Sequence, residues 1–209
     1  VVVTALNNPP TVEAGDNETV LNKTNVQMLP TGQDIDNDTL TYLWEIESTT
    51  PGGLSGAFDS QTAQNAVFTP NGKGVFTLKV TVKDTSNATA SDTLTVTAQN
   101  NAPIADAGGD RLEQGTGQIQ LSGAASIDPD GDDLTYEWEI LSGPVGGSLT
   151  NSDTQMPILN APNLGDYTLK LTVKDTENAT DSDEILVNVT KRSPLALADV
   201  NNLDQPPLS

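Results

Sequence analysis

One sequence block occurs twice in this chain, and it joins an acidic turn to a strongly patterned segment. The second copy, at 128–140, reads Asp-Pro-Asp-Gly-Asp-Asp-Leu-Thr-Tyr-Glu-Trp-Glu-Ile, and the first copy lies at 34–46. The apolar residues that alternate with polar ones in the second copy are Leu134, Tyr136, Trp138 and Ile140. Because successive side chains of a strand point to opposite faces, this period of two predicts a half-buried β-strand. Trp44 and Trp138 are therefore expected to be core residues.

Further matches between the two halves of the chain share nearly the same offset. The matched pairs are 7–10 with 100–103, Trp44 with Trp138, and 77–85 with 168–176. Their offsets are 93, 94 and 91 residues. Such a period is too long for a solenoid repeat, and it is long enough for each copy to have its own core. The repetition therefore predicts two tandem domains.

The repeat also sets the expected domain boundaries. We expect the first domain over 7–99 and the second over 100–190, with 191–209 as a linker or tail. Residues 1–6 resemble the end of the first domain, just before the second begins. We expect them to be the remnant of the last strand of an upstream repeat or an N-terminal extension, and an ordinary first strand is the alternative.

Short segments between turn residues have the spacing of a β-sandwich. Strands are predicted at 10–14, 25–29, 40–47, 65–69, 75–83 and 92–98, and at 103–107, 118–123, 134–141, 156–160, 166–174 and 183–190. The predicted fold class is all-β, with two tandem Ig-like β-sandwich domains in an extended array. Tyr167 begins its strand at the position expected for the corner tyrosine of an Ig-like sandwich. Phe76 takes the matching position and has no hydroxyl.

The balance of charges excludes several classes of function. Nine basic residues against 29 acidic ones give a net charge of −20. A surface this negative repels phosphate backbones and anionic membranes, so neither nucleic-acid binding nor membrane insertion is expected. The chain has no histidine and no cysteine, which excludes common zinc sites and histidine-based catalytic triads. Its carboxylates cluster in turns expected to face solvent, so we do not expect an enzyme.

These motifs resemble those of PKD domains, which are Ig-like β-sandwich modules. The matching pieces are the Asn-Asn-x-Pro start, Ala107-Gly108, the acidic turn, the Tyr-x-Trp strand and the Tyr-Thr-Leu-x-Leu-x-Val-x-Asp block. The first copy departs at Ile35 and Asn37, which replace Pro129 and Gly131. The resemblance implies a non-catalytic module of a secreted or cell-surface protein, used as a spacer, an adhesion element or an accessory to secreted enzymes.

Calcium is the cofactor that the sequence favours. Ca²⁺ binds six to eight oxygen ligands and needs neither nitrogen nor sulfur. PKD-like modules of secreted collagenases bind calcium at one end of the sandwich, and the resemblance implies a similar structural site here. In the second domain its residues would be Asn100, Asn101, Asp128, Asp130 and Asp175, and in the first domain Asn7, Asn8, Asp34, Asp36 and Asp84. The alternative is a solvated turn whose aspartates cap backbone N–H groups.

Two non-catalytic functions stay open at this point. One is a calcium-stabilised extracellular spacer or adhesion segment, whose partners are neighbouring repeats of the same chain. The other is an accessory module that binds polysaccharide or a surface protein in a secreted degrading system. Only three Phe, two Trp and three Tyr are present, and most lie in predicted strands, so few are available to stack on sugars. The spacer is the favoured prediction.

Overall fold

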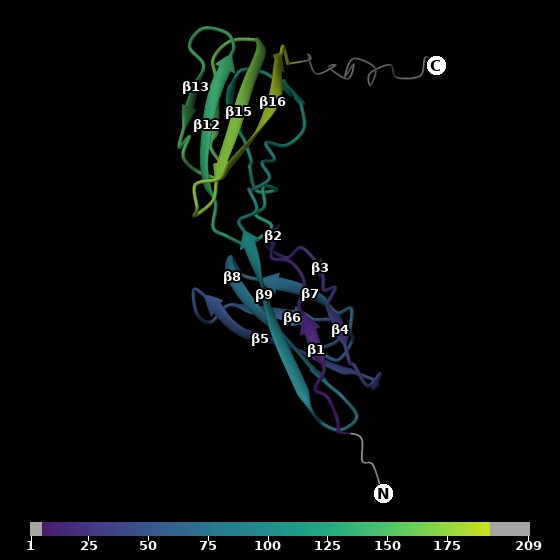
Figure 1. Ribbon diagram of the computed structural model, residues 1–209. Coiled ribbons are helices and arrows are strands. Elements are labelled where there is room, and N and C mark those ends of the chain that lie inside the picture. Colours follow the sequence, from purple (N-terminus) through teal and green to yellow (C-terminus); the bar gives the residue numbers. More distant parts are fainter. Residues whose placement is uncertain (1–5, 193–209) are drawn as a thin grey trace, which may run out of the picture. The chain divides into compact units, whose positions relative to one another are not determined.

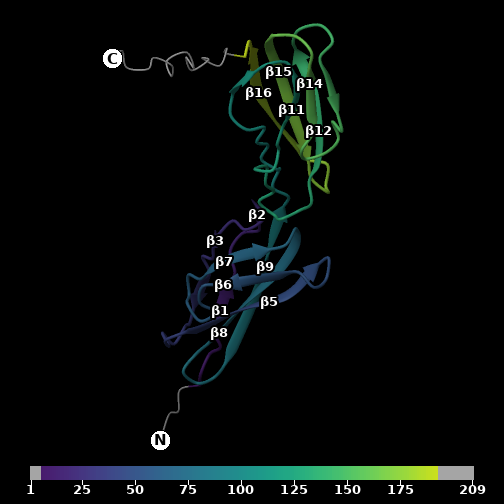
Figure 2. The ribbon, with the colours of Figure 1, turned by 180° about the vertical axis from the view of Figure 1, so that it is seen from behind.

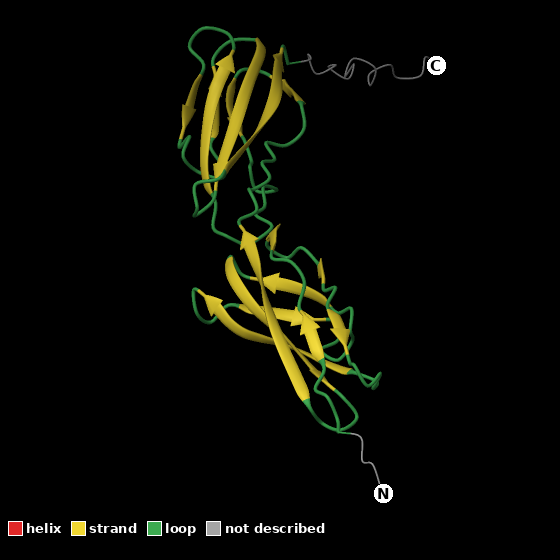
Figure 3. Ribbon diagram, viewed as in Figure 1, coloured by secondary structure: helices red, strands yellow, loops and turns green. Residues whose placement is uncertain are grey.

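The computed structural model describes residues 6–192. This part of the chain consists of strands, turns and loops and contains no helix (Figure 3). Consequently, no described helix could cross a membrane. Contacts between residues divide the chain into two compact units. The first unit comprises the chain through Asn101 together with Pro129–Gly131, and the second comprises Ala102–Asp128 and the chain from Asp132 onward.

The first unit is a β-sandwich. Its strands are β1 (Thr11–Glu13), β2 (Glu18–Leu21), β3 (Val26–Gln27), β4 (Thr31–Gln33), β5 (Thr41–Thr50), β6 (Ser55–Phe58), β7 (Val67–Asn71), β8 (Gly74–Lys83) and β9 (Thr89–Gln99). One sheet has the order β2-β9-β8-β5, and the other has the order β3-β7-β6 (Figure 1). Strands β1 and β4 form a separate pair. All neighbours are antiparallel except β2 and β9, which run parallel.

The second unit repeats this arrangement with fewer strands. They are β10 (Arg111–Gln114), β11 (Gly117–Gln120), β12 (Thr135–Ser142), β13 (Ser148–Thr150), β14 (Ile158–Ala161), β15 (Gly165–Lys174) and β16 (Thr180–Thr190). The sheets have the orders β10-β16-β15-β12 and β11-β14-β13, and Figure 2 shows strands of both sheets from behind, among them β11, β14, β15 and β16. The parallel pair is again formed by an early strand and the last one, β10 and β16. The all-β, tandem Ig-like prediction is confirmed.

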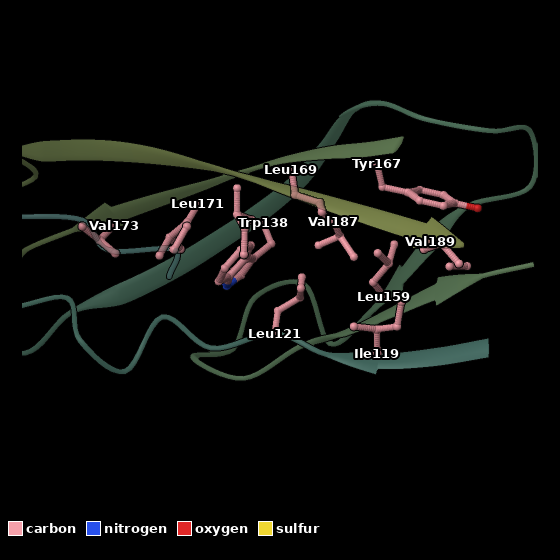
Figure 4. Packing of buried hydrophobic residues seen from close by; sticks show 13 residues of the cluster. Ile119, Leu121, Trp138, Leu159, Tyr167, Leu169, Leu171, Val173, Val187 and Val189 are labelled. Carbon is pink, nitrogen blue, oxygen red and sulfur yellow. The ribbon is translucent and has the colours of Figure 1, made fainter. Parts of the chain in front are cut away.

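Each sandwich closes on a core that contains its tryptophan. Trp44 on β5 is 0% exposed and Trp138 on β12 is 3% exposed, so both are core residues as predicted. Figure 4 shows Trp138 packed among aliphatic side chains from both sheets of the second unit. The alternation along β8 and β15 supplies the facing side chains, because every second residue of these strands is buried.

The two units differ at the start of their longest buried strand. Tyr167 is fully buried, and its hydroxyl donates a hydrogen bond to the backbone oxygen of Asn163 at 2.9 Å. This contact confirms the predicted corner tyrosine of the second unit. Phe76 is equally buried in the first unit but cannot donate. The same corner is therefore closed by packing and a hydrogen bond in one unit, and by packing alone in the other.

The predicted strands fail where the chain is short, exposed or irregular. The strand expected at 103–107 is wrong, because this segment makes only an isolated bridge between Ile104 and Ile127. The parallel strands β2 and β10 were missed, and so were β4, β6 and β13. These segments have three or four residues each and no buried residue. Without burial on one face, the sequence carries no clear alternation there.

Candidate metal centre

The leading segment of the first unit meets two distant turns at one end of the sandwich. The Asn7 amide donates to Asp84 Oδ2 at 2.8 Å, at the turn between β8 and β9. Asn8 donates through its backbone N–H to Asp36 Oδ2 at 2.7 Å, in the loop between β4 and β5. Its side-chain amide also donates to Asp36 Oδ1 at 3.1 Å. The structure thus brings together the segments that carry the site residues predicted for this unit. We refer to Asn7, Asn8, Asp34, Asp36, Asp38 and Asp84 as the first acidic pole.

Three carboxylates of this pole form a compact group. Oxygen atoms of Asp34, Asp38 and Asp84 lie within 4.8 Å of one another. Asp34 Oδ1 accepts hydrogen bonds from the backbone N–H groups of Asp36 and Asp38, at 2.8 and 3.3 Å. Asp34 Oδ2 is buried, and among the described residues it has no hydrogen-bond partner. A buried carboxylate oxygen without a donor is costly unless it has some positive partner.

Asp84 is the most enclosed member of the first acidic pole. It is 4% exposed, and its Oδ1 accepts from the backbone N–H of Ala88 at 2.8 Å. The hydrogen bond from the Asn7 amide lowers the pKa of Asp84, although burial acts in the opposite direction. Backbone N–H groups of the hairpin turn lower the pKa further. Asp84 is therefore held as a carboxylate, the form that can bind a cation.

Asp130 has a comparable hydrogen-bond environment. The backbone N–H and the side-chain amide of Asn101 each donate to Asp130 at 2.8 Å. The amide of Asn22 donates to the same carboxylate at 2.9 Å. Burial raises the pKa of Asp130, but these hydrogen bonds and the charge of Lys73 outweigh it, so the pKa is lowered. Asn100, the other predicted residue of this leading segment, is half-buried.

The second unit also has a compact carboxylate group. Its members are Asp132, Asp175 and Glu177, whose oxygen atoms lie within 4.8 Å of one another. The backbone N–H of Asp132 donates to Asp128 Oδ1 at 3.3 Å, which places Asp128 beside this group. Asp175 is 4% exposed, and its Oδ1 accepts from the backbone N–H groups of Glu177 and Ala179 at 2.9 and 2.8 Å. We refer to Asp132, Asp175 and Glu177 as the second acidic pole.

The sequence prediction missed three carboxylates of these poles. They are Asp38, Asp132 and Glu177. The first two occupy matching positions at an offset of 94, and each lies four residues after the first aspartate of its turn. That signal was available, because the turn folds residue i+4 back onto residue i. The carboxylate of Asp36 accepts from Asn8 and lies outside the three-carboxylate group of the first acidic pole.

The donor set of both poles suits a hard cation. It consists of carboxylate and amide oxygens, with no histidine or cysteine anywhere in the sequence. Such ligands select calcium or magnesium over zinc and copper. Backbone capping is also present, as the alternative interpretation expects, because Asp34, Asp84 and Asp175 each accept turn N–H groups. Capping leaves Asp34 Oδ2 unexplained, and this orphan oxygen fits a bound cation.

The sandwiches, their corner geometry and their acidic turns together define a tandem of Ig-like β-sandwich modules. The family model described as "K319L-like, PKD domain" matches this chain twice, over residues 14–98 and 107–189. The chain therefore belongs to the PKD domain family, as the sequence motifs predicted.

Curated relatives place similar modules inside much longer proteins. The rat "Dyslexia-associated protein KIAA0319 homolog" is 32% identical over 196 residues, which cover 90% of this chain and 18% of the rat protein. The human "Dyslexia-associated protein KIAA0319" is 28% identical, over 92% of this chain and 18% of its own length. The chain thus spans less than a fifth of these relatives. A solved PKD domain from the KIAA 1837 protein is 28% identical, with a TM-score of 0.41, and covers 46% of this chain and 95% of that domain.

Proposed function

We propose that each PKD unit is a non-catalytic module of a larger extracellular protein and that a calcium ion at its acidic pole stabilises it. The observation that carries this proposal is the buried Asp34 Oδ2, which has no hydrogen-bond partner among the described residues. Oxygens of Asp38 and Asp84 lie within 4.8 Å of this carboxylate. A divalent cation would offset two of the three negative charges and relieve the repulsion among the carboxylates.

Calcium fits this set better than magnesium does. Mg²⁺ requires near-ideal octahedral geometry and keeps several waters, whereas Ca²⁺ accepts irregular sets of six to eight oxygens. The first acidic pole combines carboxylates from two turns with amide side chains of the leading segment, which is an irregular set. The bound ion would link that leading segment to the loop before β5 and to the β8–β9 turn. It would therefore hold together three segments that are far apart in the sequence.

Family membership and the nature of the module support the proposed spacer or adhesion role. PKD units recur here in tandem, and the chain spans less than a fifth of its curated relatives. A repeated sandwich with a highly acidic surface is suited to presenting other domains in an extracellular medium. The carboxylates lie in turns rather than in a cleft with a nucleophile, which favours a mechanical role over a catalytic one.

The test is a calcium titration of the intact chain followed by heteronuclear NMR and by thermal melting. A ligand that binds only the folded state raises its stability, by about 2.7 kcal/mol at a concentration one hundred times the Kd. We expect saturable shifts at residues 34–38 and 84–88 and a melting temperature that rises with calcium. The Asp34→Asn variant should lose the shifts of the first unit and keep those of the second.

Asp16→Asn is the matched control, because Asp16 is exposed and lies outside both poles. It removes the same charge as Asp34→Asn, so it separates a specific ligand from general relief of acidic repulsion. Equal melting with calcium and with EDTA, or equal effects of the two variants, would contradict the calcium proposal.

A further inference from the structure

An open hollow of about 580 Å³ borders the first acidic pole. We call it the Tyr42 hollow, and the polar residues that line it are Gln33, Asp34, Asn37, Asp38, Tyr42 and Gln64. The volume lies in the range of small-molecule sites in proteins. These residues come from the end of β4, from the loop before β5, from β5 itself and from the segment before β7. The hollow therefore belongs to the first unit alone.

The matching residues of the second unit are joined to each other. Trp44 and Trp138 donate through their backbone N–H groups to Gln61 and Ser152, which align the two segments at an offset of 91 residues. Gln64 therefore corresponds to Gln155, and Tyr42 to Tyr136. In the second unit the Gln155 amide donates to the Tyr136 hydroxyl at 3.0 Å.

In the first unit, the Tyr42 hydroxyl and the Gln64 side-chain amide are not hydrogen-bonded to each other. Within residues 6–192, neither the Tyr42 hydroxyl nor the Gln64 side chain has a hydrogen-bond partner, and both line the hollow. Gly32 leaves room for the tyrosine, because a Cβ atom on this residue would lie 2.7 Å from the Tyr42 hydroxyl oxygen. The tyrosine thus lies against bare backbone instead of reaching Gln64. The tyrosine hydroxyl and the glutamine amide bind each other in the second unit. In the first unit the corresponding groups can bind a ligand instead.

The chemistry of the lining selects among ligands. Gln33, Asn37 and Gln64 each offer amide donors and an acceptor, and the Tyr42 hydroxyl offers both. Asp34 and Asp38 add acceptors and repel anions. A sugar presents neighbouring hydroxyls that both donate and accept, so it can satisfy the whole set without carrying charge. A lysine or arginine side chain would suit the carboxylates but would leave the amide donors without acceptors.

We propose that the Tyr42 hollow binds a neutral sugar unit, which would add glycan recognition to the mechanical role of the first unit. The Tyr42 hydroxyl and the Gln64 amide are the specificity groups, and the amides of Gln33 and Asn37 complete the set. The second unit does not share this function, because its Tyr136 and Gln155 bind each other. The proposal does not require the cation, so it can fail independently of the calcium proposal.

The test is an NMR titration of the intact chain with the methyl glycosides of glucose, galactose, mannose and N-acetylglucosamine. Each titration is run once in calcium and once in EDTA. We expect at least one glycoside to give saturable shifts confined to residues 32–42 and Gln64. Tyr42→Phe and Gln64→Ala should each weaken this binding by about five- to tenfold, the usual size of a single hydrogen bond. Both variants should fold, because neither side-chain polar group has a partner in the described structure.

The matched control is Tyr136→Phe, which removes the corresponding hydroxyl of the second unit and should leave sugar binding unchanged. Sugar binding in both buffers would show that the side chains alone recognise the sugar. Sugar binding in calcium alone would show that the cation is part of the site. Either result supports a sugar site. Two outcomes would overturn the proposal. One is no saturable shift with any glycoside in either buffer. The other is saturable binding of Nα-acetylarginine methylamide at these residues without sugar binding, which would assign the hollow to a basic peptide.

Discussion

The first and second acidic poles are built on the same turns but differ in the carboxylates that they contain. The compact group is Asp34, Asp38 and Asp84 in the first pole and Asp132, Asp175 and Glu177 in the second. Part of the difference comes from one position, because Ser86 in the first β8–β9 turn corresponds to Glu177 in the second unit. The repeat therefore fixes where the carboxylates converge, while single substitutions change how much negative charge gathers there.

The backbone of the two turns is less different than their sequences suggest. Asn37 replaces Gly131, yet both residues adopt a positive φ, at 62° and 86°. Asparagine and glycine are the residues that tolerate this left-handed conformation best. The replacement therefore preserves the turn that folds the fifth residue of each block back onto the first. This explains why the first unit keeps a carboxylate group despite the weaker match of its motif.

The largest effect that can challenge the equivalence of the two units lies in their cores. Trp44→Ala and Trp138→Ala should each destabilise the mutated unit by about 3–5 kcal/mol, because each leaves a large cavity among packed side chains. Urea unfolding followed by NMR measures the free energy of unfolding of the mutated unit. The tryptophan that remains reports by fluorescence on the other unit and serves as the control. Unequal losses would show that the two cores do not depend on their tryptophans alike.

A smaller effect should distinguish the two corners. Tyr167→Phe removes the hydrogen bond to Asn163 and should cost about 1 kcal/mol, since the ring stays in place. The reciprocal Phe76→Tyr change should give no gain unless the new hydroxyl finds an acceptor. Urea unfolding of each variant measures its change in the free energy of unfolding. Loss of stability below the error of the measurement in Tyr167→Phe would remove this difference between the units.

The smallest predicted effect concerns how the stability of the first unit depends on pH in acid. The pKa of Asp84 is lowered in the folded state, so its stabilising contribution is present above the unfolded value of about 3.9 and is lost as the pH falls through the folded pKa. Asn7→Ala removes the main cause and should return the pKa of Asp84 toward its ordinary value. Carboxyl NMR titration of the wild type and the variant measures this shift directly. An unchanged Asp84 titration in Asn7→Ala would show that backbone donors alone hold the carboxylate.

Strongly periodic parts of the sequence were sufficient to predict the fold. Buried residues alternate with more accessible ones along β8 and β15 and around Trp44 and Trp138, so the sequence periodicity agrees with the structure. The short strands β2 and β10 could not be found in this way, because they have no buried residue and depend on pairing with the last strand of each unit. Their existence is a consequence of tertiary contacts rather than of local sequence.

The candidate site was predicted in outline and missed in detail for a similar reason. The resemblance placed Asn7, Asp34 and Asp84 in one region, and the structure brings these residues together. It did not place Asp38, because adjacency to Asp34 depends on a turn closed by a backbone hydrogen bond to Asp34 Oδ1. Nor could it show that Tyr42 and Gln64 are apart while Tyr136 and Gln155 are joined. Such differences depend on side-chain positions that matched sequence motifs do not determine.

The parallel pairing of β2 with β9, and of β10 with β16, has a mechanical consequence. In each pair an early strand and the last strand run in the same direction. Tension applied to the two ends of a unit would slide these strands past each other in shear. The cross-strand hydrogen bonds would then share the load and break together rather than one after another. A chain of such units would resist extension through its terminal strand pairs.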